Sequence, residues 1–243
     1  MSDSDPRKEM SRKTRRAFVL GGLTALTGGG AFAWLLNRPD QDGIPWPLRK
    51  GLLANEKLWR LFFHRSSRAA EVDVPPGKIP RVNGDIGLDS DIDVDEWKLT
   101  VQGGKAPLAL TLADLRSLPR TEESFAFKCI EGWSDRNRYA GVRFKDFMEH
   151  YGLDDSKRYV AFETPDRQYY VSLDMPSMLH PQTLLCYEMD GAPLTDEHGA
   201  PLRLVVPVKY GIKSLKRISR IYLADARPPD YWVEQGYDWY AGL

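Results

Sequence analysis

The sequence predicts an α+β fold in one globular domain that follows an apolar N-terminal segment. Short strand-like and helix-like segments alternate irregularly, without the β-α-β rhythm of a parallel sheet, and no internal repeat is visible. After the first three dozen residues, about 200 remain, which is enough for one substantial core.

Residues 1–37 have the organisation of an export signal. The first 18 residues are polar and basic, and the run Thr14 to Val19 (TRRAFV) resembles the twin-arginine signature ahead of an uncharged stretch. A membrane anchor is the alternative, because Val19–Leu36 approaches the roughly 20 residues that span a bilayer. Five glycines make the stretch weakly apolar, and Ala31-Phe32-Ala33 offers a cleavage site. We therefore predict a twin-arginine signal or N-terminal anchor, and a periplasmic or extracytoplasmic protein that the segment could hold at the membrane.

Residues 38–74 are predicted to join this segment to the main domain. Arg38–Pro47 is rich in Pro, Gly and Asp, as in a linker, and Asn55–His64 has the apolar spacing of a short amphipathic helix. The main domain is predicted over 75–243 and begins with an extended loop, Pro75–Asp95.

Regular elements follow along the main domain. Helices are predicted at Thr111–Leu118, which begins with a capping residue, and at Arg143–Tyr151, which ends at Gly152. Period-two or continuous apolar runs predict strands at Trp97–Gln102, Ser124–Ile130, Arg158–Glu163, Gln168–Leu173, Thr183–Glu188, Leu202–Val206 and Arg220–Ala224.

Composition excludes several classes of function. The 34 basic and 34 acidic residues cancel, so no nucleic-acid partner is expected. Cys129 and Cys186 are the only cysteines, too few for a disulfide framework, and Cys186 lies in an apolar strand as a core residue would. The usual zinc, P-loop and dinucleotide motifs are missing from the sequence.

Cys129 is the candidate for chemistry because it lies where an apolar strand breaks into a loop. A lone cysteine is by itself more often a small core residue than a ligand. Its neighbours change this, since the segment 127–134 (FKCIEGWS) resembles the cysteine segment of the sulfite-oxidase superfamily's molybdopterin-binding domain, especially its periplasmic methionine-sulfoxide reductase branch. Later segments resemble the same family in the same order: 159–164 (YVAFET), 185–194 (LCYEMDGAPL), 198–207 (HGAPLRLVVP) and 209–216 (KYGIKSLK).

The resemblance implies a sulfite-oxidase-type fold of mixed short sheets with scattered short helices, and a molybdenum–molybdopterin cofactor. A soft thiolate suits a metal already held by dithiolene sulfurs, so Cys129 would be the metal ligand. Carried over residue by residue, the pterin or its phosphate would be contacted by Cys129, Asn83, Thr164, His198, Arg203, Ser214, Leu215 and Lys216.

Two of these assignments have alternatives. Lys209, Lys213, Lys216 and Arg220 have helical spacing, as on a solvated face, although Gly211 favours a loop that meets an anion. His198 could instead be a turn histidine bound to the backbone.

Glu131 bears on the substrate. Relatives that handle sulfite or nitrate carry arginine after the cysteine, whereas a carboxylate here would repel an anion. We therefore expect reduction of a neutral S-oxide or N-oxide, with Cys129, Glu131 and Tyr139 as the catalytic group. Arg136 and Arg138 could restore an anion site, so a sulfite or oxyanion oxidoreductase is one alternative, and a non-catalytic exported binding module is another. Glu131 could also simply shape its loop.

Electrons need a separate route, because the sequence carries no CxxCH haem-attachment motif. We expect a separate electron-transfer partner, a membrane cytochrome or quinone-linked protein, that serves a monomer acting on a small-molecule or protein-bound oxide. The helix near Trp59 and the aromatic run 231–240 are candidate docking surfaces or ordinary packing.

Overall fold

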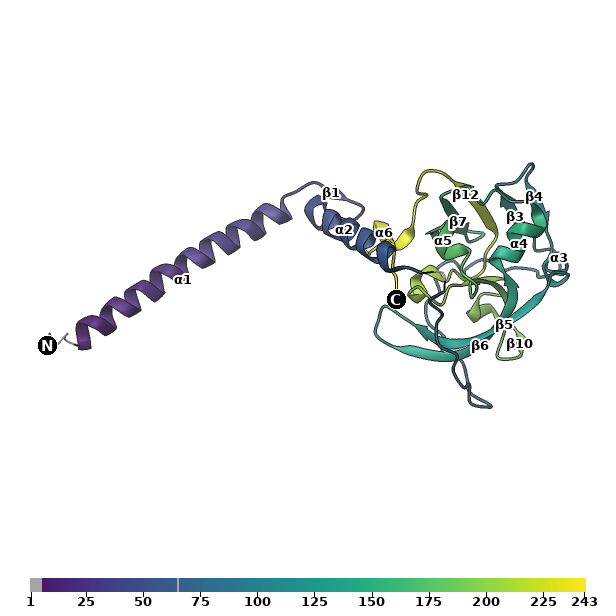
Figure 1. Cartoon of the computed structure of the whole chain (residues 1–243), viewed down its shortest axis with the longest axis horizontal. Coiled ribbons are helices and arrows are strands. Elements are labelled where there is room, and N and C mark those ends of the chain that lie inside the picture. Colours follow the sequence, from purple (N-terminus) through teal and green to yellow (C-terminus); the bar gives the residue numbers. More distant parts are fainter. Residues whose placement is uncertain (1–5, 65) are drawn as a thin grey trace. The chain divides into compact units, whose positions relative to one another are not determined.

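The N-terminal part of the chain forms its own compact unit, up to Leu52, and the second unit begins at Leu53. The computed structural model describes residues 6–64 and 66–243. Helix α1 (Pro6–Leu36) is exposed from Met10 to Trp34 (Figure 1). Over Met10–Leu36 it is the one described helix long and apolar enough to cross a membrane. The Thr24 and Thr27 hydroxyls donate 2.8 Å hydrogen bonds to carbonyls four residues back, which satisfies these polar groups within the helix.

Helix α2 (Trp46–Phe62) begins nine residues before the predicted start at Asn55, so part of the predicted linker is wrong. It follows a small hairpin of β1 (Asp40–Gln41) and β2 (Ile44–Pro45) (Figure 1). Proline in the first turn of a helix is favourable, because the missing N–H has no intrahelical partner there. The Pro47 that suggests a linker therefore lies in the first turn of the helix.

Two five-stranded sheets form the second unit. One runs β10-β9-β6-β5, with β11 also paired to β9, and the other runs β4-β3-β12-β7-β8. The first contains β5 (Arg120–Lys128), β6 (Ser134–Arg143), β9 (Leu184–Met189), β10 (Ala192–Pro193) and β11 (Arg203–Val205). The second contains β3 (Leu99–Gln102), β4 (Leu108–Leu110), β7 (Tyr159–Glu163), β8 (Tyr170–Asp174) and β12 (Arg220–Ala224). All pairs are antiparallel except β12 with β3, which confirms the predicted α+β class.

Short helices complete the second unit. They are α3 (Leu112–Arg116), α4 (Phe144–Tyr151), α5 (Met175–Met178), η1 (Asp196–His198), η2 (Gly211–Lys213) and α6 (Tyr231–Glu234). Thr111 and Asp114 form the capping box of α3, and Gly152 ends α4 with φ +59°. The basic run 209–220 contains the short turn η2 and no α-helix, and it ends at the first residue of β12, so the loop interpretation of that run is the correct one.

The main core takes side chains from both sheets. Val160, Phe162 and Ile221 come from one sheet, and Val142 and Leu185 from the other. Each predicted strand is present with ends shifted by a few residues, and Cys186 is fully buried, as predicted.

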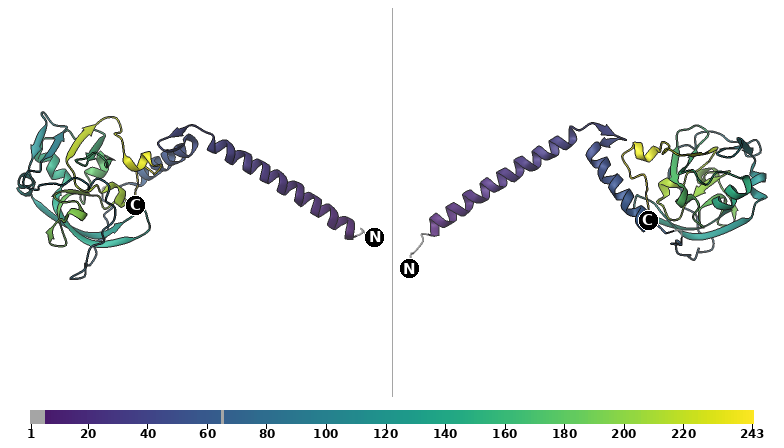
Figure 2. Two further views of the ribbon diagram at one scale, coloured as in Figure 1. Left: turned by 180° about the vertical axis from the view of Figure 1, so that it is seen from behind. Right: turned by 45° about the horizontal axis from the view of Figure 1, so that its top comes forward.

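Strand β6 is absent from the sequence-based prediction. The β5–β6 hairpin is the longest in the molecule and curves along one edge of the second unit (Figure 2). The first half of β6 reads Ser-Asp-Arg-Asn-Arg, with no apolar alternation. Its exposed side chains alternate with polar ones that point into a cavity, so neither face carries the apolar signal of a half-buried strand.

Candidate active site

One cavity in the second unit collects most of the predicted site residues. Its walls come from the loop before β3, the β5–β6 hairpin, the segment from η1 to β11, the η2 turn and the aromatic C-terminal segment. The lining residues are Arg81, Asn83, Gly84, Ile86, Phe127, Cys129, Ile130, Glu131, Trp133, Asp135, Asn137, Tyr139, Tyr169, Met189, His198, Arg203, Gly211, Ile212, Ser214, Lys216, Trp232 and Tyr237.

Cys129 lies in the turn that joins β5 to β6. Its backbone N–H donates to the Trp133 carbonyl over 2.9 Å, and Gly132, at φ +89°, donates back to the Cys129 carbonyl over 3.1 Å. The thiol is free and 9% exposed. Burial raises the pKa of the Cys129 thiol and the Glu131 carboxylate raises it further, against the lowering effect of nearby backbone amides. Direct coordination by a metal ion would stabilise the thiolate in this environment.

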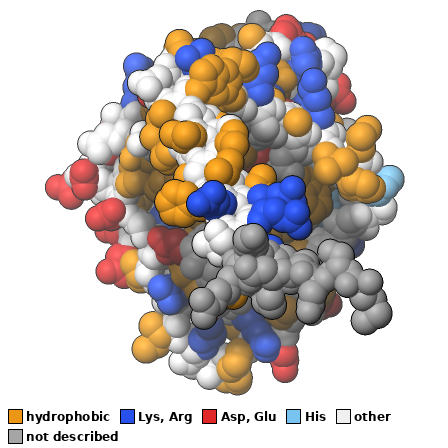
Figure 3. Space-filling view, turned by 90° about the vertical axis from the view of Figure 1, so that its left-hand side faces the viewer, with side chains coloured by type: hydrophobic (Ala, Val, Ile, Leu, Met, Phe, Trp, Pro, Cys, Tyr) orange, Lys and Arg blue, Asp and Glu red, His pale blue; other side chains and the backbone are white. Residues whose placement is uncertain are grey.

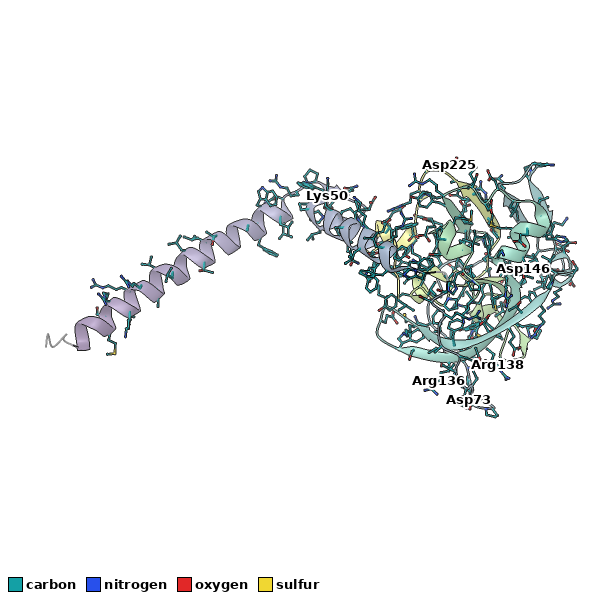
Figure 4. All side chains as sticks on the ribbon, viewed as in Figure 1. Lys50, Asp73, Arg136, Arg138, Asp146 and Asp225 are labelled. Atoms are coloured by element: carbon teal, nitrogen blue, oxygen red, sulfur yellow. The ribbon has the colours of Figure 1, made fainter. Side chains whose placement is uncertain are left out.

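The β6 strand divides its side chains between the cavity and solvent. Asp135, Asn137 and Tyr139 line the cavity, whereas Arg136 and Arg138 are exposed on the outer side of the strand and point away from the domain (Figure 4). Side chains alternate between the two faces of a strand, so these two arginines cannot join the cavity without breaking the β5–β6 register. The idea that they restore an anion site beside Cys129 is wrong.

Tyr139 lies at the buried end of a polar chain. The Asn137 amide donates to the Tyr139 hydroxyl over 3.2 Å and to Asp135 over 3.1 Å. Lys78 Nζ lies 2.7 Å from the Asp135 carboxylate and donates to the Asn137 side-chain oxygen over 2.8 Å. Burial raises the pKa of Tyr139 to about 12. At neutral pH the cavity therefore contains a protonated phenol that can donate a hydrogen bond.

Glu131 has a partner of its own at the cavity mouth. The Trp133 indole N–H donates to its carboxylate over 2.8 Å, and the Arg81 guanidinium lies 4.5 Å from the Trp133 ring centroid. The Phe127 ring stacks on Trp133 at 6.2 Å. Glu131 therefore fixes an aromatic wall, as the loop-shaping alternative expects, and keeps its carboxylate in the cavity lining.

A basic corner adjoins this wall, because the Arg203 guanidinium carbon lies 5.8 Å from the Phe127 ring centroid. Arg203, 6% exposed, donates from Nη1 to the His198 carbonyl over 3.3 Å, while its Nε has no hydrogen-bond partner among the described residues. The Lys216 ammonium donates to the carbonyls of Asn83, Gly84 and Glu197 at 2.7–2.9 Å. Burial lowers the pKa of Lys216 to about 8, and the nearby Arg203 lowers it too.

His198 and Ser214 complete this corner. Burial, then Arg203 and Lys216, lower the pKa of His198, so the ring is neutral at pH 7. The Ser214 hydroxyl accepts a hydrogen bond from the Val206 N–H at 3.3 Å and lies at the end of η2. The buried Arg203, the half-buried Lys216 and neutral donors in one corner match a phosphate-bearing ligand better than a purely apolar one.

Two of the predicted contacts lie outside the cavity lining. Leu215 is fully buried in the main core. Thr164 is 1% exposed, hydrogen-bonds Asp166 and Tyr169, and packs where a Cβ on Gly87 would come within 2.5 Å of its methyl carbon. Their side chains support the cavity walls from behind.

Several residues that line the cavity are absent from the sequence-based prediction of the site. Tyr169 donates to the Ile212 carbonyl over 2.7 Å and accepts from the Trp232 indole over 2.9 Å, which joins η2 to the C-terminal segment. Arg81 comes from the predicted extended loop Pro75–Asp95, in which the sequence predicted no cavity residue other than Asn83. The aromatic richness of 231–240 was the one available signal, and Trp232 and Tyr237 in that run do line the cavity.

The residues present fit a molybdopterin cofactor. Its metal needs a thiolate and its pterin phosphate needs cations, and the cavity offers the free Cys129 thiol together with Arg203, whose buried Nε has no acceptor among the described residues. Gly211 leaves space there, because a Cβ at that position would come within 2.5 Å of the Phe127 ring.

The family model of the oxidoreductase molybdopterin binding domain matches residues 86–232. The chain is 37% identical to the putative protein-methionine-sulfoxide reductase subunit YedZ1 of Azospira oryzae, over 98% of this chain and 91% of the relative. It is 34% identical to the protein-methionine-sulfoxide reductase catalytic subunit MsrP of Ralstonia nicotianae, over 56% of this chain and 46% of the relative.

Among solved structures, the sulfane dehydrogenase SoxCD from Paracoccus pantotrophus has a similar fold. The TM-score is 0.53 and the identity 23%, over 57% of this chain and 40% of that chain. Together with the family match, this confirms the predicted sulfite-oxidase-type fold and the cofactor class.

Proposed function

The chain belongs to the family of the oxidoreductase molybdopterin binding domain, and we propose that it is the catalytic subunit of an exported enzyme that reduces a neutral sulfoxide. The observation that carries this proposal is the free Cys129 thiol in a cavity that Arg203 and Lys216 also line. The relatives named methionine-sulfoxide reductase subunits indicate the substrate class, a thioether oxide, free or within a protein.

Two groups of cavity residues would hold the cofactor. Cys129 would bind the metal, and Arg203, Lys216, His198 and Ser214 would bind the pterin and its phosphate. When bound, the molybdenum cofactor supplies two-electron oxygen-atom transfer. The net reaction takes a sulfoxide, two electrons and two protons to a thioether and water, and the electrons come from a separate donor protein.

The chain's own groups can position the sulfoxide. The aromatic wall of Phe127 and Trp133 would contact the apolar substituents of the sulfur, since sulfur packs well on aromatic rings. The protonated Tyr139 hydroxyl would donate a hydrogen bond to the polar S–O group. A carboxylate at Glu131 disfavours an anion at the same place.

An oxyanion substrate remains the second candidate because Arg203 also lines the cavity. Its Nε has no partner among the described residues, so a sulfite ion could be its acceptor. The pterin phosphate competes for that same nitrogen, which favours the sulfoxide.

The N-terminal segment supports export, and the relatives' names support a separate electron-donating partner. We propose that residues 1–37 form a twin-arginine signal or anchor, 38–74 a connecting segment that includes α2, and 75–243 the catalytic domain. The words "catalytic subunit" in the relatives' names support a second, electron-donating component, for which a membrane cytochrome or quinone-linked protein has the right chemistry.

The test uses protein matured in a host that makes the cofactor. We expect bound molybdenum and reduction of methionine sulfoxide with a reduced viologen dye, and neither in Cys129→Ser. Cys186→Ser is the matched control, because this thiol is fully buried and does not line the cavity, and it should keep both. Sulfite oxidation without sulfoxide reduction would favour the oxyanion alternative, and a wild-type chain without molybdenum would refute the enzyme assignment.

A further inference from the structure

The second half of α2, residues 53–62, turns its polar face toward the domain. A helix on a water-soluble domain usually turns its apolar face inward instead. Glu56 is 4% exposed and accepts a 2.6 Å hydrogen bond from Arg227. One turn later, Arg60 pairs with Asp174 at 3.3 Å. The helix is therefore attached to the catalytic domain by ion pairs.

The opposite face of this half-helix is apolar and uncovered. Leu58 is 52% exposed, Leu61 76% and Phe62 65%, and Trp59 beside them is 43% exposed. A helix on a water-soluble domain turns such a stripe toward the core. Contiguous exposed apolar side chains of this size mark a contact surface.

The helix cannot roll to bury these side chains. The Trp239 ring is 4% exposed and lies between two cations of the attachment, Arg227 at 4.1 Å and Arg60 at 5.5 Å from the ring centroid. Rotation would break both contacts and separate the Glu56 carboxylate from Arg227.

The chain itself indicates what covers the apolar stripe. Helix α1, long and apolar enough to cross a membrane, ends at Leu36, and α2 begins ten residues later at Trp46. Ten residues reach at most about 35 Å, so a bilayer that holds α1 is within reach of α2. Trp59 and the exposed Lys57 are the residue types that anchor helices at the headgroup level. Figure 3 shows hydrophobic and basic side chains exposed side by side on the face that it views.

We propose that the second half of α2 lies in the membrane interface, with Leu58, Leu61 and Phe62 inserted at the boundary between headgroups and acyl chains. This inference rests on the anchor alternative of the proposed function, in which α1 spans the membrane. It adds that the catalytic domain is held against the bilayer by one defined face, rather than moving freely at the end of a tether.

The experiment uses the full chain in nanodiscs of phosphatidylethanolamine with a minor share of phosphatidylglycerol. Single variants Leu61→Cys, Leu26→Cys and Glu149→Cys are labelled with a polarity-sensitive fluorophore. Leu26 reports on α1, and Glu149 on α4 is the exposed control. The unsubstituted protein, labelled in parallel, gives the background from the native cysteines. Quenching by brominated acyl chains is compared with quenching by aqueous iodide.

The expected result is that the label at 61 is quenched by brominated lipid and protected from iodide, like the label at 26 and unlike the label at 149. Iodide quenching at 61 equal to that at 149 overturns the inference, whatever happens at 26. Protection at 61 from both quenchers overturns it too, since a second copy or another protein surface would then cover the stripe. Iodide quenching at 26 overturns the anchor instead, so the two failures are distinguishable.

Discussion

Replacing Asp230 by Asn removes the partner of a buried lysine behind the candidate active site. Lys213, on η2, is fully buried, and its ammonium lies 2.5 Å from the Asp230 carboxylate and 3.3 Å from the Ser172 carbonyl. The same carboxylate oxygen accepts from the Ser172 N–H at 3.0 Å. Both ions of the pair are about as deeply buried as any in the chain, with side chains 1% and 2% exposed.

Removing one member of a buried ion pair costs about 3–5 kcal/mol, because the other charge is left without compensation. For a domain of this size each kcal/mol moves the Tm by about 2–4 °C, so Asp230→Asn should lower the Tm by roughly 6–20 °C. The assay is thermal unfolding of the full chain followed by circular dichroism. Asp225→Asn is the matched control: its carboxylate, labelled in Figure 4, pairs with Lys157 at 2.7 Å on the surface, and its loss should leave the Tm unchanged.

The pH dependence follows from the sign of the lysine's shift. Burial lowers the pKa of Lys213 and Asp230 raises it again, so the variant lowers this pKa in the folded state still further below its unfolded value. A base with a lowered folded pKa destabilises the fold at low pH, and the penalty disappears as the pH rises and the lysine becomes neutral. The deficit of Asp230→Asn should therefore shrink as the pH rises toward the ordinary pKa of lysine, about 10.4. A Tm equal to that of Asp225→Asn, or a deficit that grows with pH, would refute the reasoning.

Three further changes test other parts of the structure. Gly141→Ala should lower the free energy of unfolding by about 1–3 kcal/mol or more, because its Cβ would lie 2.0 Å from a backbone carbonyl oxygen of strand β9. The measurement is urea unfolding, and a midpoint concentration equal to that of the wild type would contradict the close approach. Trp133→Phe keeps an aromatic wall but loses the 2.8 Å bond to Glu131, so kcat/KM for a sulfoxide should fall by about tenfold or less with little change in Tm. Replacing Arg15 and Arg16 by Lys should leave the protein in the cytoplasm in a fractionation experiment, and unchanged export would remove the twin-arginine assignment.

Local sequence patterns determined most of the secondary structure. The Thr111 capping box, the Gly152 helix end and the period-two apolar strands act within a few residues, so they can be read without the fold. The cysteine segment and its downstream companions identified the family, because a motif at a strand end retains its meaning in any chain that contains it.

Only the tertiary structure decided which side chains meet in the cavity. Strand β6 has no apolar alternation, since one face borders a polar cavity and the other borders solvent, and only its register on β5 turns Asn137 inward and Arg136 outward. Lys216 takes its partners from segments more than a hundred residues apart, the carbonyls of Asn83 and Glu197. The sequence thus determined the thiol, the family and the cofactor class, whereas the fold determined which charges surround the thiol, because strand register and loop closure are set by packing over the whole domain.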